Sequence, residues 1–369
     1  MKKKNVVVAM SGGVDSSVAA VMLKEQGYNV IGMTMKLWNY EKLGIDINHE
    51  SGCCSLDSVN DARNVCNSID SPYYVVNFSE EFDNNVIDNF VSEYLHGRTP
   101  NPCVMCNTTI KWDTLVKKAF EIGADFVATG HYARIGFEKD ENRFSLLKGL
   151  DDSKDQSYAL WGVQQHSLEH TMLPLGELTK KEVRELAHKY EIKTADKPES
   201  QEICFIPDND YEKFLKKAVP ELEEKVAGGK IIGESGEELG IHRGFPFYTI
   251  GQRRRIGITT PEPIYVNKID FKTNTIHVGS NDKLLDIGLT AKGANWVSKK
   301  PTTIPFPADV KIRYNSPPYP GTVYYDGEGN FKVIFDEPQR AVTPGQSLVI
   351  YENDKVVAGA FIEEAIKYD

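Results

Sequence analysis

Hydrophobic and polar residues follow one rhythm in the first third of the chain. Short apolar runs, typical of buried strands, alternate with segments whose apolar residues recur every three or four positions, as on one face of a helix. The strand-like runs are residues 5–10, 28–36, 73–77 and 125–129, and the helix-like segments are residues 15–26, 55–69, 79–96 and about 108–122. Strands separated by helices predict an α/β fold with a doubly wound parallel sheet.

A different rhythm follows residue 263, where short β-rich runs are separated by turn residues. These runs are residues 264–270, 275–278, 310–314, 322–325, 331–335, 347–351 and 356–361. The turn Asp326-Gly327-Glu328-Gly329 between two of them is a strong hairpin signal. Earlier in the chain, Thr179 and Glu182 have the spacing of a capping box for a helix that ends near residue 190. We therefore predict three domains: residues 1–205 with the parallel sheet, a small central domain at 206–275, and an all-β, barrel-like domain at 276–369.

Composition narrows the class of protein. Hydrophobic residues make up 40% of the 369 positions and charged residues 26%, which indicates globular domains and excludes disorder as the main state. No apolar stretch approaches the ~18–20 residues of a membrane-spanning helix, so we expect no membrane association and a cytoplasmic location. The net charge of −10 argues against a protein that coats nucleic acid non-specifically, but it permits a local basic patch that binds one RNA.

The segment Ser11-Gly12-Gly13-Val14-Asp15-Ser16-Ser17 is the strongest candidate for a binding loop. It directly follows a predicted strand and opens a predicted helix. Glycines let the backbone approach an anion closely, and N–H groups at a helix N-terminus, together with serine hydroxyls, can hold a phosphate. The Gly-Lys-Ser/Thr ending of a Walker A loop is missing. The residues therefore predict a phosphate-binding loop of another kind.

The six cysteines are too few for a disulfide framework in a chain of this length, so we expect catalysis, redox chemistry or metal binding from them. Cys103 and Cys106 form a Cys-x-x-Cys pair in a proline-stiffened loop before a helix, where the pKa of a thiol is lowered. This pair fits a redox couple or half of a metal site, and no second pair completes a Cys₄ zinc site. Cys204, between Ile203 and Phe205, has by itself the surroundings of a core cysteine.

Residues 241–261 form a basic and aromatic segment, with four arginines and no acidic residue. Arginines can neutralise phosphates while aromatic rings stack on exposed bases, so Arg253, Arg254 and Arg255 are candidates for RNA contact. Taken alone, such a segment is more typical of ordinary solvated surface.

Together and in this order, the motifs resemble the bacterial tRNA-specific 2-thiouridylases, a family of the PP-loop ATP pyrophosphatase group. The resemblance runs through nearly the whole chain. Besides the loop at residues 11–17, it rests on Asn101-Pro102-Cys103-Val104-Met105-Cys106-Asn107, Lys154-Asp155-Gln156-Ser157-Tyr158, Ser200-Gln201-Glu202-Ile203-Cys204-Phe205-Ile206, Phe247-Tyr248-Thr249-Ile250-Gly251-Gln252-Arg253 and Arg313-Tyr314.

This resemblance implies thiolation, dependent on ATP and Mg²⁺, at carbon 2 of the wobble uridine in tRNA-Lys, tRNA-Glu and tRNA-Gln. The uridine C2 oxygen would attack the α-phosphate of ATP and leave later as part of AMP. Cys204 would carry a persulfide sulfur received from a cysteine desulfurase or a sulfur-relay protein, and Cys106 would be its partner nucleophile. Two routes stay open: the persulfide attacks C2 directly, or Cys106 frees hydrosulfide by forming a disulfide.

The resemblance also implies the binding residues. Asp15 would face the phosphates and the metal, within an ATP site formed by Ala9, Met10, Ser11, Gly12, Gly13, Val14, Asp15, Ser16, Met35 and Gly130. The target base would contact Asn101, Pro102 and Cys103. The tRNA would contact Lys154, Asp155, Gln156, Arg313 and Tyr314, besides the three arginines at 253–255. No set of protein ligands for a resident metal ion is implied.

Cys103 departs from the family pattern, because some members have Asp there, with a role as base or base contact. A carboxylate's role does not transfer to a thiol, although Cys103 still fits contact with a flipped uridine. Three thiols near one point, Cys103, Cys106 and Cys204, could instead hold an iron–sulfur cluster, as in some other tRNA-thiolating enzymes. Cys53, Cys54 and Cys66 match no catalytic motif, so we expect structural roles for them.

Two rival functions are open at this point. One is a PP-loop ligase that adenylates a carbonyl and then transfers nitrogen, but such an enzyme has no need for paired cysteines. The other is an ATP-binding redox or cluster sensor, which would explain the thiols but leave the arginine-rich segment and the β domain without a task. Sulfur incorporation into tRNA that depends on both ATP and Cys204 would discriminate between them.

Overall fold

The first domain is built on a five-stranded parallel sheet. In the computed structural model, which describes residues 3–38, 55–198, 203–206, 209–298, 300–301 and 303–368, its strands lie in the order β3-β2-β1-β4-β7. All neighbouring pairs are parallel. The strands are β1 (Asn5–Ala9), β2 (Asn29–Lys36), β3 (Tyr73–Asn77), β4 (Phe126–Ala128) and β7 (Thr171–Met172). The predicted parallel sheet is confirmed.

Helices cover both faces of this sheet. Successive residues of β1 show it, because Val6 and Val8 belong to one cluster of buried side chains and Val7 and Ala9 to another. The Val6 face packs on α1 (Val14–Glu25), α3 (Leu56–Ser68) and α9 (Lys180–Lys189), and the Val7 face packs on α4 (Ser79–Phe82), α5 (Asp88–Leu95) and α7 (Leu115–Glu121). The predicted capping box at the start of α9 is present and is formed by Thr179 and Glu182.

Two long helical segments on the Val7 face each contain a π-helical stretch. The helix predicted for residues 79–96 consists of α4, η1 (Asp83–Ile87) and α5 in direct succession. The second segment runs from α6 (Pro102–Met105) through η2 (Cys106–Thr114) into α7. Its predicted start near residue 108 is wrong because the Asn101 side chain caps the helix, accepting a hydrogen bond from the Val104 N–H, and Pro102 occupies the first helical position.

A hairpin of the first domain reaches the β domain. It consists of β5 (Ala133–Glu138) and β6 (Arg143–Lys148), which the sequence pattern did not predict, and β6 pairs with β17 at Leu147 and Lys355. Two short helices follow it, η3 (Ser157–Leu160) and α8 (Gln165–Leu168).

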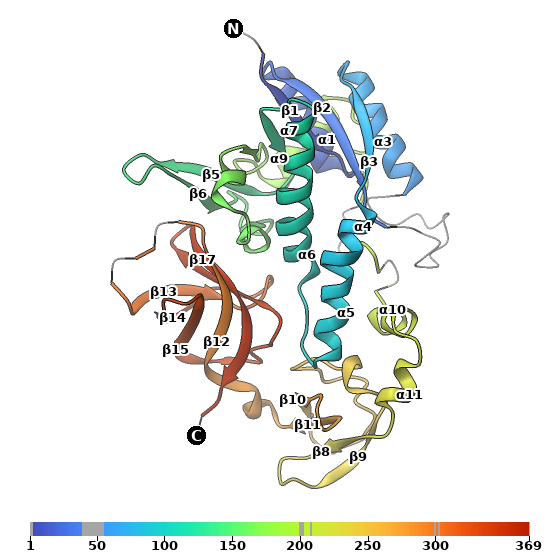
Figure 1. The fold of residues 1–369 in the computed structure, drawn as a ribbon, viewed down its shortest axis with the longest axis vertical. Coiled ribbons are helices and arrows are strands. Elements are labelled where there is room, and N and C mark those ends of the chain that lie inside the picture. Colours follow the sequence, from blue (N-terminus) through green and yellow to red (C-terminus); the bar gives the residue numbers. More distant parts are fainter. Residues whose placement is uncertain are drawn as a thin grey trace.

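The central domain combines two helices with a small mixed sheet. Its elements are α10 (Tyr211–Ala218), α11 (Leu222–Val226), β8 (Gly229–Ile232), β9 (Glu238–His242), η4 (Phe245–Phe247), β10 (Tyr265–Asp270) and β11 (Thr275–Gly279). The strand order is β10-β11-β8-β9. In Figure 1, α5 extends from the first domain down to this domain.

The C-terminal domain is a closed antiparallel barrel, which confirms the prediction. Six strands follow the order β12-β15-β14-β13-β16-β17, and β12 also pairs with β17, so the sheet closes on itself. After η5 (Asn281–Leu284) come β12 (Leu285–Trp296), β13 (Phe306–Lys311), β14 (Tyr319–Tyr325), β15 (Asn330–Arg340), β16 (Ser347–Glu352) and β17 (Lys355–Ile366). The predicted turn at residues 326–329 joins β14 and β15. The run predicted at 310–314 is shifted, because β13 ends at Lys311.

None of the helices in the described parts of the chain is long and apolar enough to cross a membrane.

Candidate functional site

The loop between β1 and α1 leaves the first turn of a helix open to a ligand. Gly12 has φ +72°, and a Cβ there would lie 2.2 Å from the Ser58 carbonyl oxygen, so the tight turn requires glycine. Gly13 is the N-cap of α1 and supplies no side chain to cap it. The N–H groups of the first helical turn therefore have no side-chain cap from Gly13, as an anion-binding loop requires.

Serine hydroxyls fix the shape of this loop. The Ser16 hydroxyl accepts a hydrogen bond from the Ser11 N–H at 3.2 Å, and the Ser17 hydroxyl donates to the Gly13 carbonyl at 2.8 Å. Ser16 and Ser17 are buried, whereas Ser11 is exposed. Of the three hydroxyls, Ser11 is the one best placed to meet a bound phosphate.

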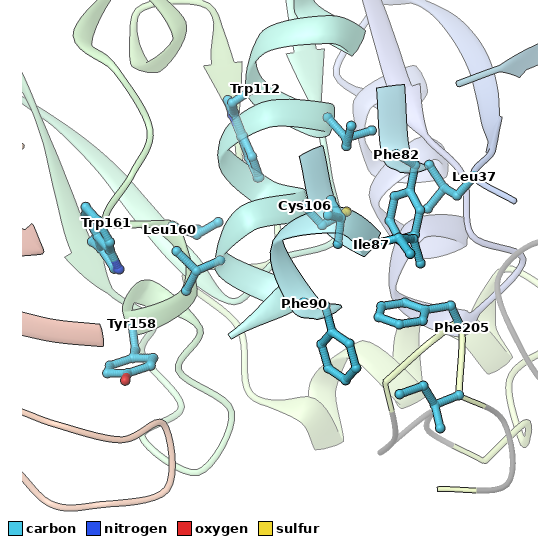
Figure 2. Close-up of a cluster of buried hydrophobic side chains, with 14 of the residues drawn as sticks. Leu37, Phe82, Ile87, Phe90, Cys106, Trp112, Tyr158, Leu160, Trp161 and Phe205 are labelled. Carbon is cyan, nitrogen blue, oxygen red and sulfur yellow. The ribbon is translucent and has the colours of Figure 1, made fainter. Parts of the chain in front are cut away.

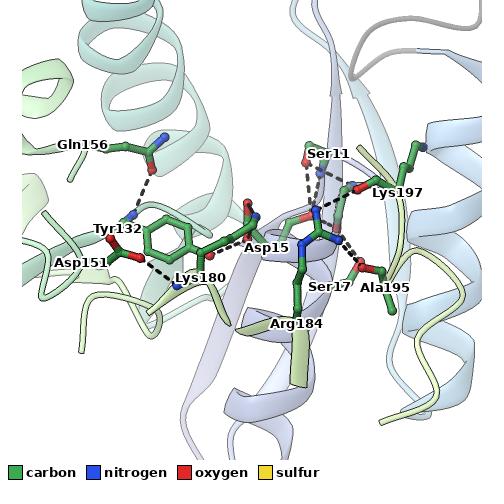
Figure 3. A network of polar contacts seen from close by, with 12 residues as sticks. Ser11, Asp15, Ser17, Tyr132, Asp151, Gln156, Lys180, Arg184, Ala195 and Lys197 are labelled. Atoms are coloured by element: carbon green, nitrogen blue, oxygen red, sulfur yellow. Dashed lines mark hydrogen bonds and ion pairs between the residues drawn. The ribbon is translucent and has the colours of Figure 1, made fainter. Parts of the chain in front are cut away.

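Asp15 is held by a buried cation that the sequence analysis did not single out. Lys180, at the start of α9, places Nζ 2.7 and 2.9 Å from the two carboxylate oxygens of Asp15 (Figure 3). The Tyr132 hydroxyl donates to Asp15 Oδ1 at 2.7 Å, and Asp151 accepts from the Lys180 backbone N–H at 3.0 Å. Lys180 is only 9% exposed. The sole local signal was the capping box, which places Lys180 in the first turn of a helix without saying what it meets.

A second lysine touches the loop from the segment after α9. Lys197 Nζ donates to the Gly12 carbonyl at 3.3 Å and pairs with Asp61 on α3 at 2.9 Å. Arg184 on α9 donates to the carbonyls of Ala195 and Lys197, which fixes this segment beside the loop (Figure 3). The candidate phosphate site thus has lysines on two sides.

Gly130 closes the loop from the end of β4. A Cβ at Gly130 would lie 2.8 Å from the Asp15 carbonyl carbon and the Ser16 nitrogen, so β4 meets the start of α1 without any space between them. Met35 lies on β2, half-buried against the cluster on the Val7 face. Their contacts with a nucleotide stay predictions.

The thiol loop is held by the two other domains. The Thr99 N–H donates to the Pro344 carbonyl at 2.9 Å, and the Gln346 amide donates to the carbonyls of Thr99 and Pro100 at 2.9 and 3.1 Å. The Thr99 hydroxyl donates to that of Thr249 in the central domain at 3.2 Å. These contacts fix the backbone that leads into Asn101, Pro102 and Cys103.

The thiols at 103 and 106 have different surroundings. Cys103 is exposed, whereas Cys106 is 8% exposed and belongs to the cluster on the Val7 face. Protein atoms surround the accessible Cys103 thiol on most sides, and this desolvation raises its pKa, while the charge of Lys111 acts in the opposite direction. The expected low pKa therefore does not hold for Cys103.

Cys204 lies against the same cluster as Cys106. It is half-buried, and its neighbour Phe205 is 1% exposed, with its ring packed edge-on against Phe82 and Phe90 at centroid distances of 5.7 and 5.3 Å. Figure 2 shows Phe205 and Cys106 around Phe90. Residues 200–202 of the same motif lie outside the described residues, as do Cys53 and Cys54. Cys66 is buried, and burial raises the pKa of its thiol to about 11.

The described thiols at positions 66, 103, 106 and 204 form no metal-binding cluster. Over the residues that the structure describes, no group of three or more His, Cys, Asp or Glu side chains is placed to hold a metal ion. Cys103, Cys106 and Cys204 are all among those residues, so their arrangement does not fit an iron–sulfur cluster.

The residues predicted to contact RNA differ in their exposure to solvent. Arg253, Arg254 and Arg255 are exposed, and two of them line an open hollow of about 500 Å³ with Pro261 and neighbouring residues. Lys154 is half-buried and Tyr314 is exposed.

The other three predicted contacts have structural tasks. Asp155 accepts hydrogen bonds from the backbone N–H groups of Gly149 and Ser157 at 3.0 Å, and Gln156 accepts from the Tyr132 N–H at 2.9 Å. The half-buried Arg313 donates to the Ala341 carbonyl at 2.8 Å. Their contact with tRNA stays a prediction.

The fold and the site define a class of protein. Its members have a parallel α/β domain with a candidate phosphate-binding loop before α1, followed by a small mixed domain and a β-barrel. Models of protein families match the same three parts: tRNA methyl transferase HUP domain at residues 4–208, tRNA methyl transferase PRC-barrel domain at 212–280, and aminomethyltransferase beta-barrel domain at 287–362. The chain belongs to the family of tRNA-specific 2-thiouridylases.

Full-length relatives support this membership. The chain is 48% identical over 366 residues to the tRNA-specific 2-thiouridylase MnmA of Carboxydothermus hydrogenoformans, covering 99% of each chain. It is 50% identical over 364 residues to that of Salinibacter ruber, covering 98% of this chain and 95% of the relative. Among solved structures, a 4-thiouridine synthetase–RNA complex with bound ATP matches 59% of this chain and 51% of its own, with 17% identity and a TM-score of 0.38.

Proposed function

We propose that the protein is a cytoplasmic enzyme that replaces the C2 oxygen of the wobble uridine with sulfur in tRNA-Lys, tRNA-Glu and tRNA-Gln. The observation that carries this proposal is the near-complete match, at 48–50% identity, to chains named tRNA-specific 2-thiouridylase. The loop before α1, which has no side-chain cap, and the thiols of Cys106 and Cys204 agree with it. A nitrogen-transferring ligase or a redox sensor would leave the tRNA specificity of those relatives unexplained.

In the first step, ATP activates the base. The phosphates would bind at the first turn of α1, and Asp15 would hold the Mg²⁺ that offsets their negative charge. Met35 and Gly130 contact the nucleotide. Lys180, whose ammonium pairs with the Asp15 carboxylate, would add positive charge beside the bound phosphates.

In the second step, sulfur replaces the activated oxygen. Cys204 carries a persulfide received from a cysteine desulfurase or a sulfur-relay protein. Its terminal sulfur bonds to C2 while the C2–O bond breaks and AMP leaves with the electron pair. The sulfur–sulfur bond of the persulfide breaks when Cys106 attacks Cys204, before or after the C2 bond forms, and a Cys106–Cys204 disulfide results.

The persulfide route is favoured over a cluster because of the geometry of the three thiols. One is exposed, one is buried and one is half-buried, and together they make no metal-binding group in the described structure. A cluster would need all three at one point.

The experiment is an anaerobic assay of purified protein with ATP, Mg²⁺, unmodified tRNA-Glu and a persulfide-charged desulfurase. We expect 2-thiouridine at the wobble position from a colourless, iron-free sample. Thiolation that requires a reconstituted brown cluster would keep the substrate and overturn the sulfur route, and adenylation without any 2-thiouridine would overturn the function.

The tRNA surface is tested by replacing Arg253, Arg254 and Arg255 together with Ala. These exposed arginines neutralise phosphates in our proposal, so the slope of log binding constant against log salt should flatten by about two to three. A triple variant of the exposed lysines Lys117, Lys181 and Lys300 controls for net charge. An unchanged slope would return the arginine segment to ordinary surface.

A further inference from the structure

A lysine and a histidine meet beside Cys103, outside the residues already given a role. Lys111 Nζ lies 3.4 Å from His131 Nε2, and His131 Nδ1 lies 2.7 Å from the Thr129 hydroxyl. The Trp112 ring packs against the imidazole at a centroid distance of 5.3 Å. Lys111 and His131 are half-buried, so this corner is accessible.

The hydrogen bonds fix the protonation of His131. An ammonium only donates hydrogen bonds, so Nε2 accepts from Lys111, and Nδ1 carries the proton and donates to Thr129. Burial, together with the charge of Lys111, holds the pKa of His131 well below its usual range. The imidazole is therefore neutral at pH 7 and orients Lys111 without neutralising its charge.

The π-helical stretch η2 places Lys111 under Cys103. The two residues are eight positions apart on one continuous helical segment, α6 followed by η2. A π-turn takes up about one residue more than an α-turn, so eight residues make roughly two turns and the two side chains share a face. The extra residue in the π-helical turn thus brings Lys111 to the face of the helix that carries Cys103.

This corner also lies between the two halves of the proposed active site. Gly130, directly before His131, touches Asp15 and Ser16 of the phosphate loop. Asn101 and Pro102, directly before Cys103, belong to the loop proposed to meet the base. In the proposed complex, a cation at Lys111 would therefore lie between the residues assigned to the uridine and those assigned to the ATP phosphates.

We propose that Lys111 stabilises the negative charge of the target uridine while its C2 oxygen attacks ATP; this rests on the proposed function. The N3 proton of uridine passes to water. The C2 oxygen bonds to the α-phosphorus, and the bond from that phosphorus to the bridging oxygen breaks, its electron pair leaving with pyrophosphate. Lys111 provides the positive charge that a deprotonated base requires, and no carboxylate base is needed at position 103.

The described elements packed against η2 carry both acidic and uncharged groups. The acidic ones on α4 and η1 are Glu80, Glu81 and Asp83, and no ion pair between them and Lys111 is among the contacts described above. The uncharged groups described next to Lys111 are the imidazole of His131 and the thiol of Cys103, and η3, which carries the phenol of Tyr158, also packs against η2. Tyr158 donates its hydroxyl proton to the Ser347 carbonyl at 2.9 Å, and burial raises its pKa. Among the described residues, Lys111 is the charge that acts on both the Cys103 thiol and His131.

The first test needs no enzymatic activity. Iodoacetamide labelling of Cys103 is followed against pH by mass spectrometry in the parent protein, in Lys111→Met and in Lys111→Arg. Without the nearby cation, the midpoint of labelling should rise by about one pH unit in Lys111→Met and stay in place in Lys111→Arg. Lys117→Met, an exposed lysine paired with Asp113 on the same helical segment, is the control.

The second test measures AMP formation with tRNA and ATP across pH 6–9. At pH 7 the rate in Lys111→Met should fall about 100-fold and recover as the pH rises, because hydroxide then removes the N3 proton, while tRNA binding is retained. Lys111→Arg should retain most of the rate. An active parent protein whose Lys111→Met variant keeps both its rate profile and its labelling midpoint would overturn this proposal alone. A parent protein that forms no AMP with tRNA would overturn the proposed function, and this proposal with it.

Discussion

The phosphate loop and the thiol loop are built in opposite ways. The phosphate loop is held by contacts within the first domain: Gly12 turns into a left-handed conformation against Ser58, serine hydroxyls bond to neighbouring backbone, and Lys180 pairs with Asp15. The thiol loop takes its hydrogen bonds from Pro344 and Gln346 in the barrel and from Thr249 in the central domain. The contacts named for the first loop all lie within one domain, whereas the position of the second loop depends on contacts with all three domains.

Removing Asp15 should break the phosphate side completely. Asp15→Ala takes away the metal-facing carboxylate and leaves Lys180 as a buried cation without its ion pair. AMP formation with tRNA and ATP should fall by about 1,000-fold. Asp57→Ala, an exposed carboxylate in the first turn of α3, is the matched control. Turnover of ATP to AMP at the parent rate would remove Asp15 from the site.

Removing the sulfur carrier should break only the thiol side. In Cys204→Ser the oxygen cannot carry a persulfide, so 2-thiouridine formation should fall more than about 1,000-fold. tRNA binding and AMP formation should persist, because serine is close to cysteine in size and leaves the neighbouring Phe205 packed against Phe82 and Phe90. Thiolation at the parent rate would show that another atom carries the sulfur.

Loosening the thiol loop from the barrel should have a smaller effect. Gln346→Ala removes two hydrogen bonds to Thr99 and Pro100, worth about 1–2 kcal/mol together, so thiolation should slow about tenfold. ATP binding should be unchanged. Gln339→Ala, whose amide bonds within its own strand, is the control. Equal slowing in both variants would mean that the barrel is merely less stable.

The smallest expected effect is a pH dependence of stability from His131. Its pKa in the folded protein lies well below the usual ~6.5 of an unfolded chain. As the pH falls below about 6.5, His131 is protonated in the unfolded chain but not in the folded protein, so the free energy of unfolding decreases. In His131→Gln, the drop in melting temperature from pH 7.5 to 5.5 should be about 2 °C smaller. His96→Gln, at an exposed helix end, should not differ from the parent. If the melting temperature of His131→Gln fell as much as that of the parent, the lowered pKa of His131 would be contradicted.

Sequence patterns predicted what is local. The alternation of strands and helices that indicates a parallel sheet, the capping box at Thr179 and the hairpin at residues 326–329 can each be recognised from short stretches of sequence, and each is present. The start of the helix carrying Cys106 was missed because an asparagine cap and a proline act at residues 101 and 102, before the apolar period begins.

The missed parts depend on contacts between distant segments. Lys180 reaches Asp15 across 165 positions, and β6 finds β17 through a single residue pair, neither of which has any periodicity to detect. β12 was missed because glycines at 288 and 293 interrupt its apolar alternation, although the barrel closes on it. The raised pKa of the Cys103 thiol follows from desolvation by the protein atoms around it, which no motif encodes.

Because the thiol loop depends on Pro344 and Gln346, it can reach its final position only late in the synthesis of the chain. The parallel sheet is complete once β7 ends at Met172, but the residues that fix Thr99 and Pro100 are made more than 170 residues later. At about 5–20 residues per second, that interval lasts on the order of ten seconds or more. A ribosome-bound chain can therefore acquire a nucleotide pocket well before its sulfur chemistry is in position, and only the finished protein has both.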